Sequence, residues 1–310
     1  MTIAMPSSGE TPEVRTSASS TTRPFYWSLR RELWENRSIH VAPLVAAGVV
    51  LFGFLLANRN LATKMDQWRL LDSASRTSKL ELPYHFAAFA ILVTGVIVAV
   101  AYCLGALHGE RRDRSILFWK SLPVSDLTAV LAKAAVPTLV VPAATFIVIV
   151  ATHMVMLLLN VAVLLANGKS AAPLWSDLPL GQMDITLLYG LAVLSLWYAP
   201  IYGWLLLVSA WARRVPFLWA VLPPLALCLI EKIAFESENL RSVLADRLGG
   251  GFSEAFTHGA FQPGHRSMGD QASQIDAVGF LTTPDLWIGL MVAGGFLAGA
   301  VWLRRRREAL

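Results

Sequence analysis

Few side chains in this sequence could do chemistry, and those that could are scattered along the chain. His153 lies near the middle of a long apolar stretch, where an imidazole could bind a substrate, carry a proton or simply bond to a neighbouring helix. Glu231 and Lys232 lie near the end of another such stretch, where mutual pairing or contact with the membrane interface explains them. An enzyme acting on lipid or peptide, with His85, His153 and Glu231 as its polar groups, remains an alternative.

The usual catalytic and cofactor motifs do not occur. The triplet Gly168-Lys169-Ser170 resembles the end of a phosphate-binding loop, but the first glycine of that loop would fall at Val163, inside an apolar stretch. Cys103 and Cys228 each lie within an apolar block, so we expect neither a disulfide framework nor a thiolate metal cluster. We therefore expect no enzyme activity, no metal and no cofactor in this chain.

Composition indicates that the chain needs lipid as a solvent. Of its 310 residues, 55% are hydrophobic and 15% are charged, well below the roughly 25% charged residues of soluble domains. The apolar residues form blocks of about 20 or more, long enough to cross a bilayer as helices. Unpaired backbone amides are costly in lipid, so such blocks must be helical. We predict an all-α integral membrane protein with six transmembrane helices: Ile39–Ala57, His85–Leu107, Ala134–Leu165, Ile185–Ala210, Val215–Phe235 and Asp285–Leu303.

Prolines modify several of these spans. The third block would make a helix of roughly 50 Å, too long for an upright crossing, and Pro137 and Pro142 near its start predict a kinked or tilted beginning. Pro200 in the fourth span, and Pro223 with Pro224 in the fifth, predict local breaks. These breaks are either hinges or passive kinks.

Orientation follows from the lysines and arginines near the span ends. Most of them fall on the same side as the two termini, notably in the segment between spans two and three and at Arg304 to Arg307. We therefore expect a multi-pass protein of the plasma (inner) membrane with both termini cytoplasmic. We expect these lysines and arginines to contact membrane lipid, and we expect no nucleic-acid partner. Residues 1–22, rich in Ser, Thr and Pro, are expected to be a disordered cytoplasmic tail.

Two further helices are expected outside the spans. Phe25, Leu29 and Leu33 recur every fourth residue, which predicts a short amphipathic helix in the inner interface between Phe25 and Arg37. A polar lead-in with aromatic anchors is the simpler alternative. Between spans five and six, residues 236–248 have helical spacing and should form an outer-face helix that stops at Gly249.

The segment from His108 to Lys133, between spans two and three, combines charge with exposed apolar groups. Its first part is strongly charged, its middle contains Leu117 and Trp119, and it ends in Leu-Pro-Val-Ser, where Ser125 can cap the next helix. A short helix with such a mixed surface is suited to dock into a groove of a partner protein. The alternative is a plain membrane anchor in which the arginines hold the inner leaflet.

This segment resembles the one that follows the second span in permease subunits of type-2 ABC exporters. That family has Glu-Arg, then Thr or Ser, then leucine-rich residues ending in Pro-Val-Ser; here Arg114 stands where the family often has Gly. The resemblance implies a six-span permease domain over residues 23–310, with an N-terminal interfacial helix, a cytoplasmic coupling helix and outer-face helices between spans five and six. It implies ATPase-coupling roles for Glu110, Arg111, Arg114, Ser115, Leu117, Trp119, Leu122 and Pro123.

The resemblance also implies the partners. A separate ABC ATPase subunit would bind and hydrolyse ATP, because this chain has no phosphate-binding loop, and a second permease copy or a paralogue would complete the pathway. Glu110 and Arg111 would make polar contacts to the ATPase. A membrane sensor or scaffold that binds an ATPase without transport is a further alternative. Nothing in the spans selects a substrate.

Overall fold

The protein is described by a computed structural model that covers residues 22–68, 70–112, 125–255 and 275–306. Helices make up most of these residues. Within them, six helical segments are long and apolar enough to cross a membrane, which confirms the number expected from the sequence. These segments are Ser38–Ala57, Ser73–Arg112, Asp126–Ala166, Ala172–Trp197, Pro216–Phe235 and Pro284–Arg306.

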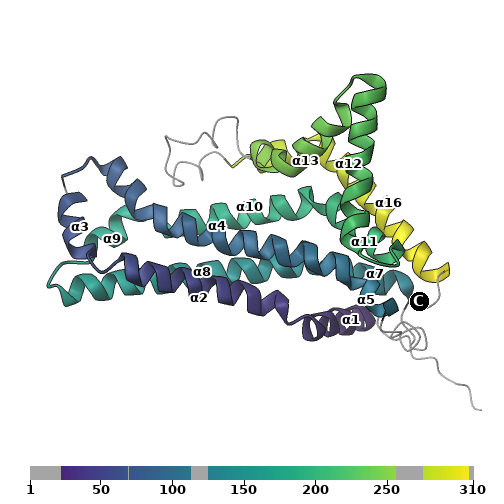
Figure 1. The fold of residues 1–310 in the computed structure, drawn as a ribbon. Coiled ribbons are helices and arrows are strands. Elements are labelled where there is room, and N and C mark those ends of the chain that lie inside the picture. Colours follow the sequence, from purple (N-terminus) through teal and green to yellow (C-terminus); the bar gives the residue numbers. More distant parts are fainter. Residues whose placement is uncertain (1–21, 69, 113–124, 256–274, 307–310) are drawn as a thin grey trace, which may run out of the picture.

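Four long helices form the body of the bundle (Figure 1). They are α2 (Ser38–Ala57), α4 (Ser73–Ala106), α8 (Val141–Ala166) and α10 (Leu180–Trp197). The helices α2, α4 and α8 pack on one another, and α10 packs on α8. Two short helices, α3 (Leu61–Trp68) and α9 (Ala172–Asp177), lie at one end, which we call the distal end.

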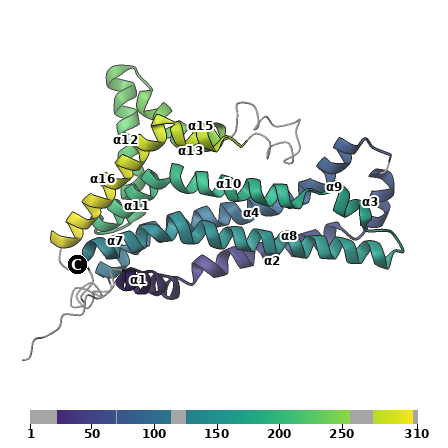
Figure 2. The same cartoon turned by 180° about the vertical axis from the view of Figure 1, so that it is seen from behind.

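The opposite end gathers elements from the whole length of the chain (Figures 1 and 2). The helix α1 (Thr22–Glu35) lies there beside α7 (Asp126–Ala135), close to α5 (His108–Arg112) and to the end of α16 (Pro284–Arg306). We call it the terminal end, because the first and last described helices meet there. The helix α11 (Ala199–Trp211) packs against α16, and α12 (Pro216–Phe235) leans away from the bundle.

The third span has an irregular turn at the place where the sequence predicted a kinked or tilted beginning. Between α7 and α8 lies a π-helical turn, η1 (Val136–Val140), in which the Val141 N–H donates to the Val136 carbonyl five residues back. Pro137 has no N–H to give to the regular four-residue ladder, so the chain takes the wider turn instead. Ser125 caps α7 as expected, because its side chain accepts a 3.1 Å hydrogen bond from the Thr128 N–H.

Three expected boundaries were wrong. The fourth span ends at Trp197 instead of Ala210, because the local break predicted at Pro200 divides the stretch at Tyr198 into two helices, α10 and α11. The helix α4 begins at Ser73, twelve residues before His85, because the Asp72 side chain accepts a hydrogen bond from Ser75 N–H and caps it. The helix α13 (Asn239–Ala255) continues through its three glycines, since glycine weakens a helix but removes no hydrogen bond.

Other expected helices are present in outline. The helix α1 occupies the segment predicted to be amphipathic; Leu29 and Leu33 pack against the core, while Trp27 and Trp34 are exposed. Between the fifth and sixth spans, α13 is followed by α15 (Ala277–Thr282). The Trp197 indole N–H donates to the Arg247 carbonyl at 3.0 Å, which fixes α13 against the end of α10.

Candidate functional site

A cluster of buried charges lies at the terminal end, between helices that are far apart in the sequence. Glu32 of α1, Glu110 of α5, Lys133 of α7 and Arg304 of α16 are each less than 9% exposed. The Lys133 ammonium lies between two carboxylates, 2.7 Å from Glu32 Oε1 and 3.1 Å from Glu110 Oε1. A buried charge persists only when it is paired, so this arrangement constrains the three helices relative to one another.

Arg304 extends the cluster to both sides of the segment 113–124. One arm of its guanidinium donates to Glu110 Oε2, and its Nε donates to Asp126 Oδ1 at 3.0 Å. Glu110 precedes that segment on α5, and Asp126 begins α7 directly after it. The guanidinium group of Arg304 therefore holds the residues on both sides of the segment against α16, the last described helix.

Tyr102 of α4 and Arg31 of α1 complete the cluster. The Tyr102 hydroxyl of α4 donates to Glu32 Oε2 at 2.7 Å. Arg31 donates to Glu35 at 2.7 Å and to Glu110 Oε1 at 3.3 Å. Partial burial alone would lower the pKa of the Arg31 guanidinium, but the carboxylates of Glu35, Glu32 and Glu110 raise that pKa above its ordinary value. Arg31 therefore stays charged.

A neighbouring set of hydrogen bonds fixes the junction of α4 and α5 to α11. The Ser209 hydroxyl accepts from the backbone N–H groups of Leu107 and His108, at 3.1 and 3.0 Å, and donates to the Leu104 carbonyl. The Arg111 guanidinium donates to the carbonyls of Ser209 and Ala212, at 2.8 and 2.7 Å. The start of the charged segment is thus fixed to α11 by hydrogen bonds and is not a free linker.

The sequence-predicted coupling residues divide into two groups. Glu110 and Arg111 are only 8% and 4% exposed and face other helices of this chain, which differs from the expected polar contacts with a partner. Spacing alone could not show which way these side chains point. The others lie outside the described residues: Arg114, Ser115, Leu117, Trp119, Leu122 and Pro123.

Sequence reasoning missed the residues that bind Glu110. In the sequence, Lys133 marks only the end of the segment between spans two and three, and Arg304 is part of a terminal basic run. A signal was available for Lys133, because a lysine followed directly by a long apolar block needs a partner. Glu32 and Arg304 carried no comparable signal, since both lie in strongly charged stretches of sequence.

His153 lies in a second polar group, in the middle of the bundle. Its ring is 2% exposed; Nδ1 is 2.8 Å from Asp184 Oδ1 of α10, and Nε2 is 3.2 Å from the Tyr84 carbonyl of α4. Nearby, the Asn160 amide donates to the Tyr84 hydroxyl at 3.2 Å. Sequence reasoning missed Asp184 because it stands one residue before the expected start of the fourth span.

Glu231, Lys232 and His85 are not part of either group. Glu231 accepts hydrogen bonds from the backbone N–H groups of Asn239 and Leu240, at 3.1 and 2.9 Å, and so caps the start of α13. Lys232 pairs with Glu238 at 2.9 Å, so mutual pairing, one of the two explanations offered for Glu231 and Lys232, does not occur. His85 Nε2 is 3.6 Å from Glu81.

No family model matches this sequence, and comparisons with curated proteins and with solved structures find no similar protein.

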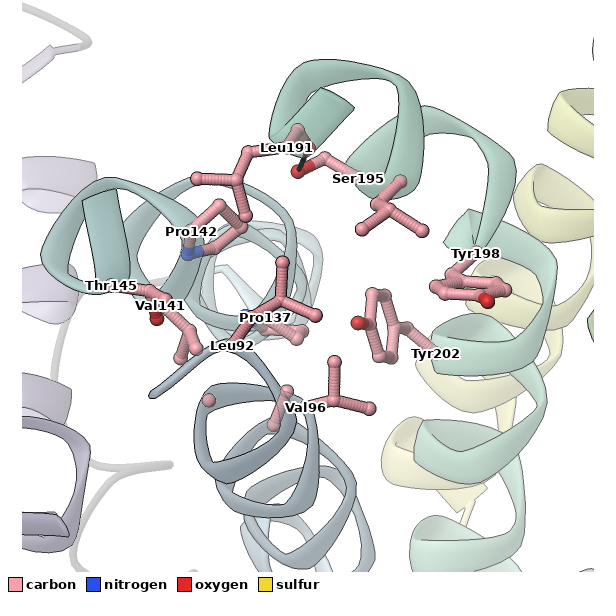
Figure 3. A pocket seen from close by; sticks show the side chains of 13 residues that line it. Leu92, Val96, Pro137, Val141, Pro142, Thr145, Leu191, Ser195, Tyr198 and Tyr202 are labelled. Atoms are coloured by element: carbon pink, nitrogen blue, oxygen red, sulfur yellow. Dashed lines mark hydrogen bonds between the residues drawn. The ribbon is translucent and has the colours of Figure 1, made fainter. Parts of the chain in front are cut away.

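A small cavity lies where η1 faces the break between α10 and α11 (Figure 3). Its volume is about 20 Å³, enough for a single water molecule and far below the ~300 Å³ of a typical ligand pocket. The side chains of Thr145, Ser195 and Tyr202 line it together with Pro137 and Pro142. This cavity is too small for a ligand larger than water, so the buried charge cluster is the stronger candidate site.

Proposed function

We propose that this chain is the permease subunit of an ATP-driven exporter, moved by a separate ATPase subunit that docks on the segment 108–126. Three observations support the proposal: six helices that could cross a membrane, the resemblance of the segment to the coupling region of type-2 ABC permeases, and the buried charge cluster at its base. The same proposal places both termini in the cytoplasm and the chain in the inner membrane.

The main support for the proposal is that Arg304 binds both Glu110, before the segment, and Asp126, after it. If the docking segment were joined to the bundle only by flexible chain, a force on it would move the segment and leave the helices in place. Here Glu110 and Asp126 are held to α16, while Lys133 holds Glu110 to α7 and to Glu32 of α1. A force on the segment would therefore reach α1, α7 and α16 together.

The proposed mechanism is mechanical. When the ATPase subunits close on ATP, they push on the docked segment, and the buried charge cluster passes this displacement to α1, α7 and α16. Arg111 passes it to α11 through the Ser209 and Ala212 carbonyls. In this mechanism Glu110 and Arg111 act as internal ties, and direct contact with the ATPase falls to residues between 113 and 124.

The test uses a conservative change at Arg304. Lysine keeps the positive charge but lacks the forked geometry that reaches Glu110 and Asp126 together, so Arg304→Lys should loosen the tie. We expect a P-loop ATPase to co-purify with the tagged full chain, and its ATP hydrolysis to be stimulated by that chain. Arg304→Lys should reduce the stimulation several-fold while the ATPase still co-purifies.

Arg305→Lys is the matched control, because Arg305 is exposed and belongs to the same terminal basic run. It should leave stimulation unchanged. Recovery of the full chain without any P-loop ATPase would reject the proposed function. Equal stimulation by the wild type and Arg304→Lys would reject the role of the buried charge cluster.

A further inference from the structure

The His153–Asp184 pair has a hydrogen-bond pattern that fixes how many protons it holds. The imidazole Nε2 faces the Tyr84 backbone carbonyl at 3.2 Å, and Nδ1 faces the Asp184 carboxyl at 2.8 Å. A carbonyl oxygen only accepts hydrogen bonds, so Nε2 must carry a hydrogen. The remaining question is where a hydrogen lies between Nδ1 and Asp184.

Only two arrangements form both hydrogen bonds. In one, Nδ1 also carries a hydrogen and an imidazolium donates to an ionised carboxylate. In the other, the imidazole is neutral and a protonated Asp184 donates its O–H to Nδ1. Both arrangements contain two hydrogens and have zero net charge, because they differ only in the position of one hydrogen.

Removing that proton breaks one of the two bonds. A neutral imidazole beside an ionised Asp184 has a single N–H. If this N–H points to Asp184, the Nε2 lone pair faces the Tyr84 carbonyl; if it points to Tyr84, the Nδ1 lone pair faces the carboxylate. Either contact is repulsive, and His153 is too buried for water to relieve it readily.

We propose that the His153–Asp184 pair is a proton-binding site, whose bound proton holds α4, α8 and α10 together. Each partner comes from a different helix: Tyr84 from α4, His153 from α8 and Asp184 from α10. Loss of the proton would separate two of these helices at this level. Asp184, with 15% of its side chain exposed against 2% for His153, is where a proton enters and leaves.

Other titratable groups lie on the surrounding helices. Glu81 and His85 flank Tyr84 on α4, and one Glu81 oxygen is buried without a hydrogen-bond partner among the described residues. On α10 the other such group is Tyr189, and α3 carries Lys64 and Asp66. The α2 helix carries only His40, at its opposite end. Glu81 and His85 are therefore the groups whose titration must be separated from that of the pair.

The experiment measures the stability of the full chain in lipid nanodiscs as a function of pH. The folded chain keeps a proton that an unfolded histidine gives up above about pH 6.5, so stability must fall as pH rises beyond that value. For one proton, the unfolding equilibrium constant should increase about tenfold per pH unit while the folded pair stays protonated. A wild type whose stability does not fall with rising pH in this range would overturn the proposal.

Asp184→Asn identifies the source of the effect. An asparagine amide can donate to Nδ1 of the neutral imidazole while Nε2 donates to Tyr84, so both bonds form with no proton to lose. This variant should lose the fall in stability. The control His40→Gln, at an exposed histidine, should retain it, and so should the Glu81→Gln/His85→Gln variant. Loss of the pH dependence in Glu81→Gln/His85→Gln would overturn the proposal.

A second measurement needs no variant, in case Asp184→Asn does not fold. In the ¹⁵N NMR spectrum of histidine-labelled wild type, the signal in contact with the Tyr84 ring belongs to His153, since the two ring centres are 5.5 Å apart. That signal should stay constant through the pH at which exposed His40 loses its proton. A His153 signal that changes together with His40 would overturn the assignment. Neither measurement depends on an ATPase, so this proposal and the proposed function can fail separately.

Discussion

Lys133 is the residue whose loss should damage the buried charge cluster most. Its ammonium contacts Glu32 and Glu110 and is 3% exposed. Lys133→Met keeps the length of the side chain but leaves Glu32 without its ammonium partner and Glu110 with arginines alone, and breaking a buried pair from one side typically costs about 3 kcal/mol or more. We expect the free energy of unfolding, measured by denaturing-detergent titration in mixed micelles, to fall by about that amount.

The same substitution at Lys169 is the matched control. Lys169 pairs with Asp66 at the distal end, where the two side chains are 25% and 56% exposed. A solvated pair of this kind contributes at most about 1 kcal/mol. Lys169→Met should therefore change stability much less than Lys133→Met, and equal losses in the two variants would contradict the view that burial makes the cluster a structural tie.

Individual residues differ in how far the sequence could place them. An isolated His153 within an apolar stretch was a valid signal of a polar contact, because an imidazole there needs a partner. The identity of that partner depends on the register between α8 and α10, which hydropathy does not determine. Glu110 was likewise recognised from its neighbours in sequence, but its inward direction depends on Lys133 and Arg304, which lie in other helices.

At the scale of helices, α4 packs tightly against α8 at Gly95. A Cβ atom at this position would lie 2.5 Å from Thr145 Oγ1, and Thr145 is 2% exposed. At this distance either Thr145 or the helix backbone must shift, and we expect Gly95→Ala to push the helices apart. Overpacking of this kind typically costs about 1–3 kcal/mol. A lower unfolding midpoint than the wild type is expected in the same titration.

Gly105 provides the control on the same helix, because a Cβ atom there meets nothing within 4 Å. Gly105→Ala should leave stability unchanged or raise it by up to about 1 kcal/mol through helix propensity. Thr145→Ala in the Gly95→Ala background removes the clashing atom and should restore part of the loss. No recovery in that double variant would show that the helix contact is limited elsewhere.

The helices themselves were predictable to different degrees. The number of spans and the irregular turn at Pro137 followed from hydropathy and from the missing proline N–H, both of which act locally. The separation of α10 from α11 at Tyr198 did not follow in the same way, because Pro200 is equally compatible with a kink within one helix. The outcome depends on how α11 packs against α16, which is a contact between distant parts of the chain.

At the scale of the whole molecule, α12 is the span that its own chain covers least. Only 6% of its most apolar stretch is buried, against 22–44% for the other five spans. Its inner side is marked by buried Ala220, whose carbonyl accepts from the Trp204 indole at 3.0 Å. Leu222, Leu225 and Leu229 lie on the opposite side and are 56–60% exposed. We expect this face to contact a second permease chain, as the proposed exporter requires.

Cysteine cross-linking tests that contact. In a Cys228→Ser background, Leu225→Cys on the open face of α12 should form a disulfide with Leu225→Cys of a second copy of this chain, after mild oxidation in native membranes. Leu44→Cys on α2 is the matched control, because Leu44 is 58% exposed against 60% for Leu225 but lies on a span with more internal packing. Random collision in the membrane would cross-link both positions alike, whereas a specific interface cross-links Leu225→Cys alone. A Leu225→Cys chain that stays monomeric would mean that lipid, rather than protein, covers this face of α12.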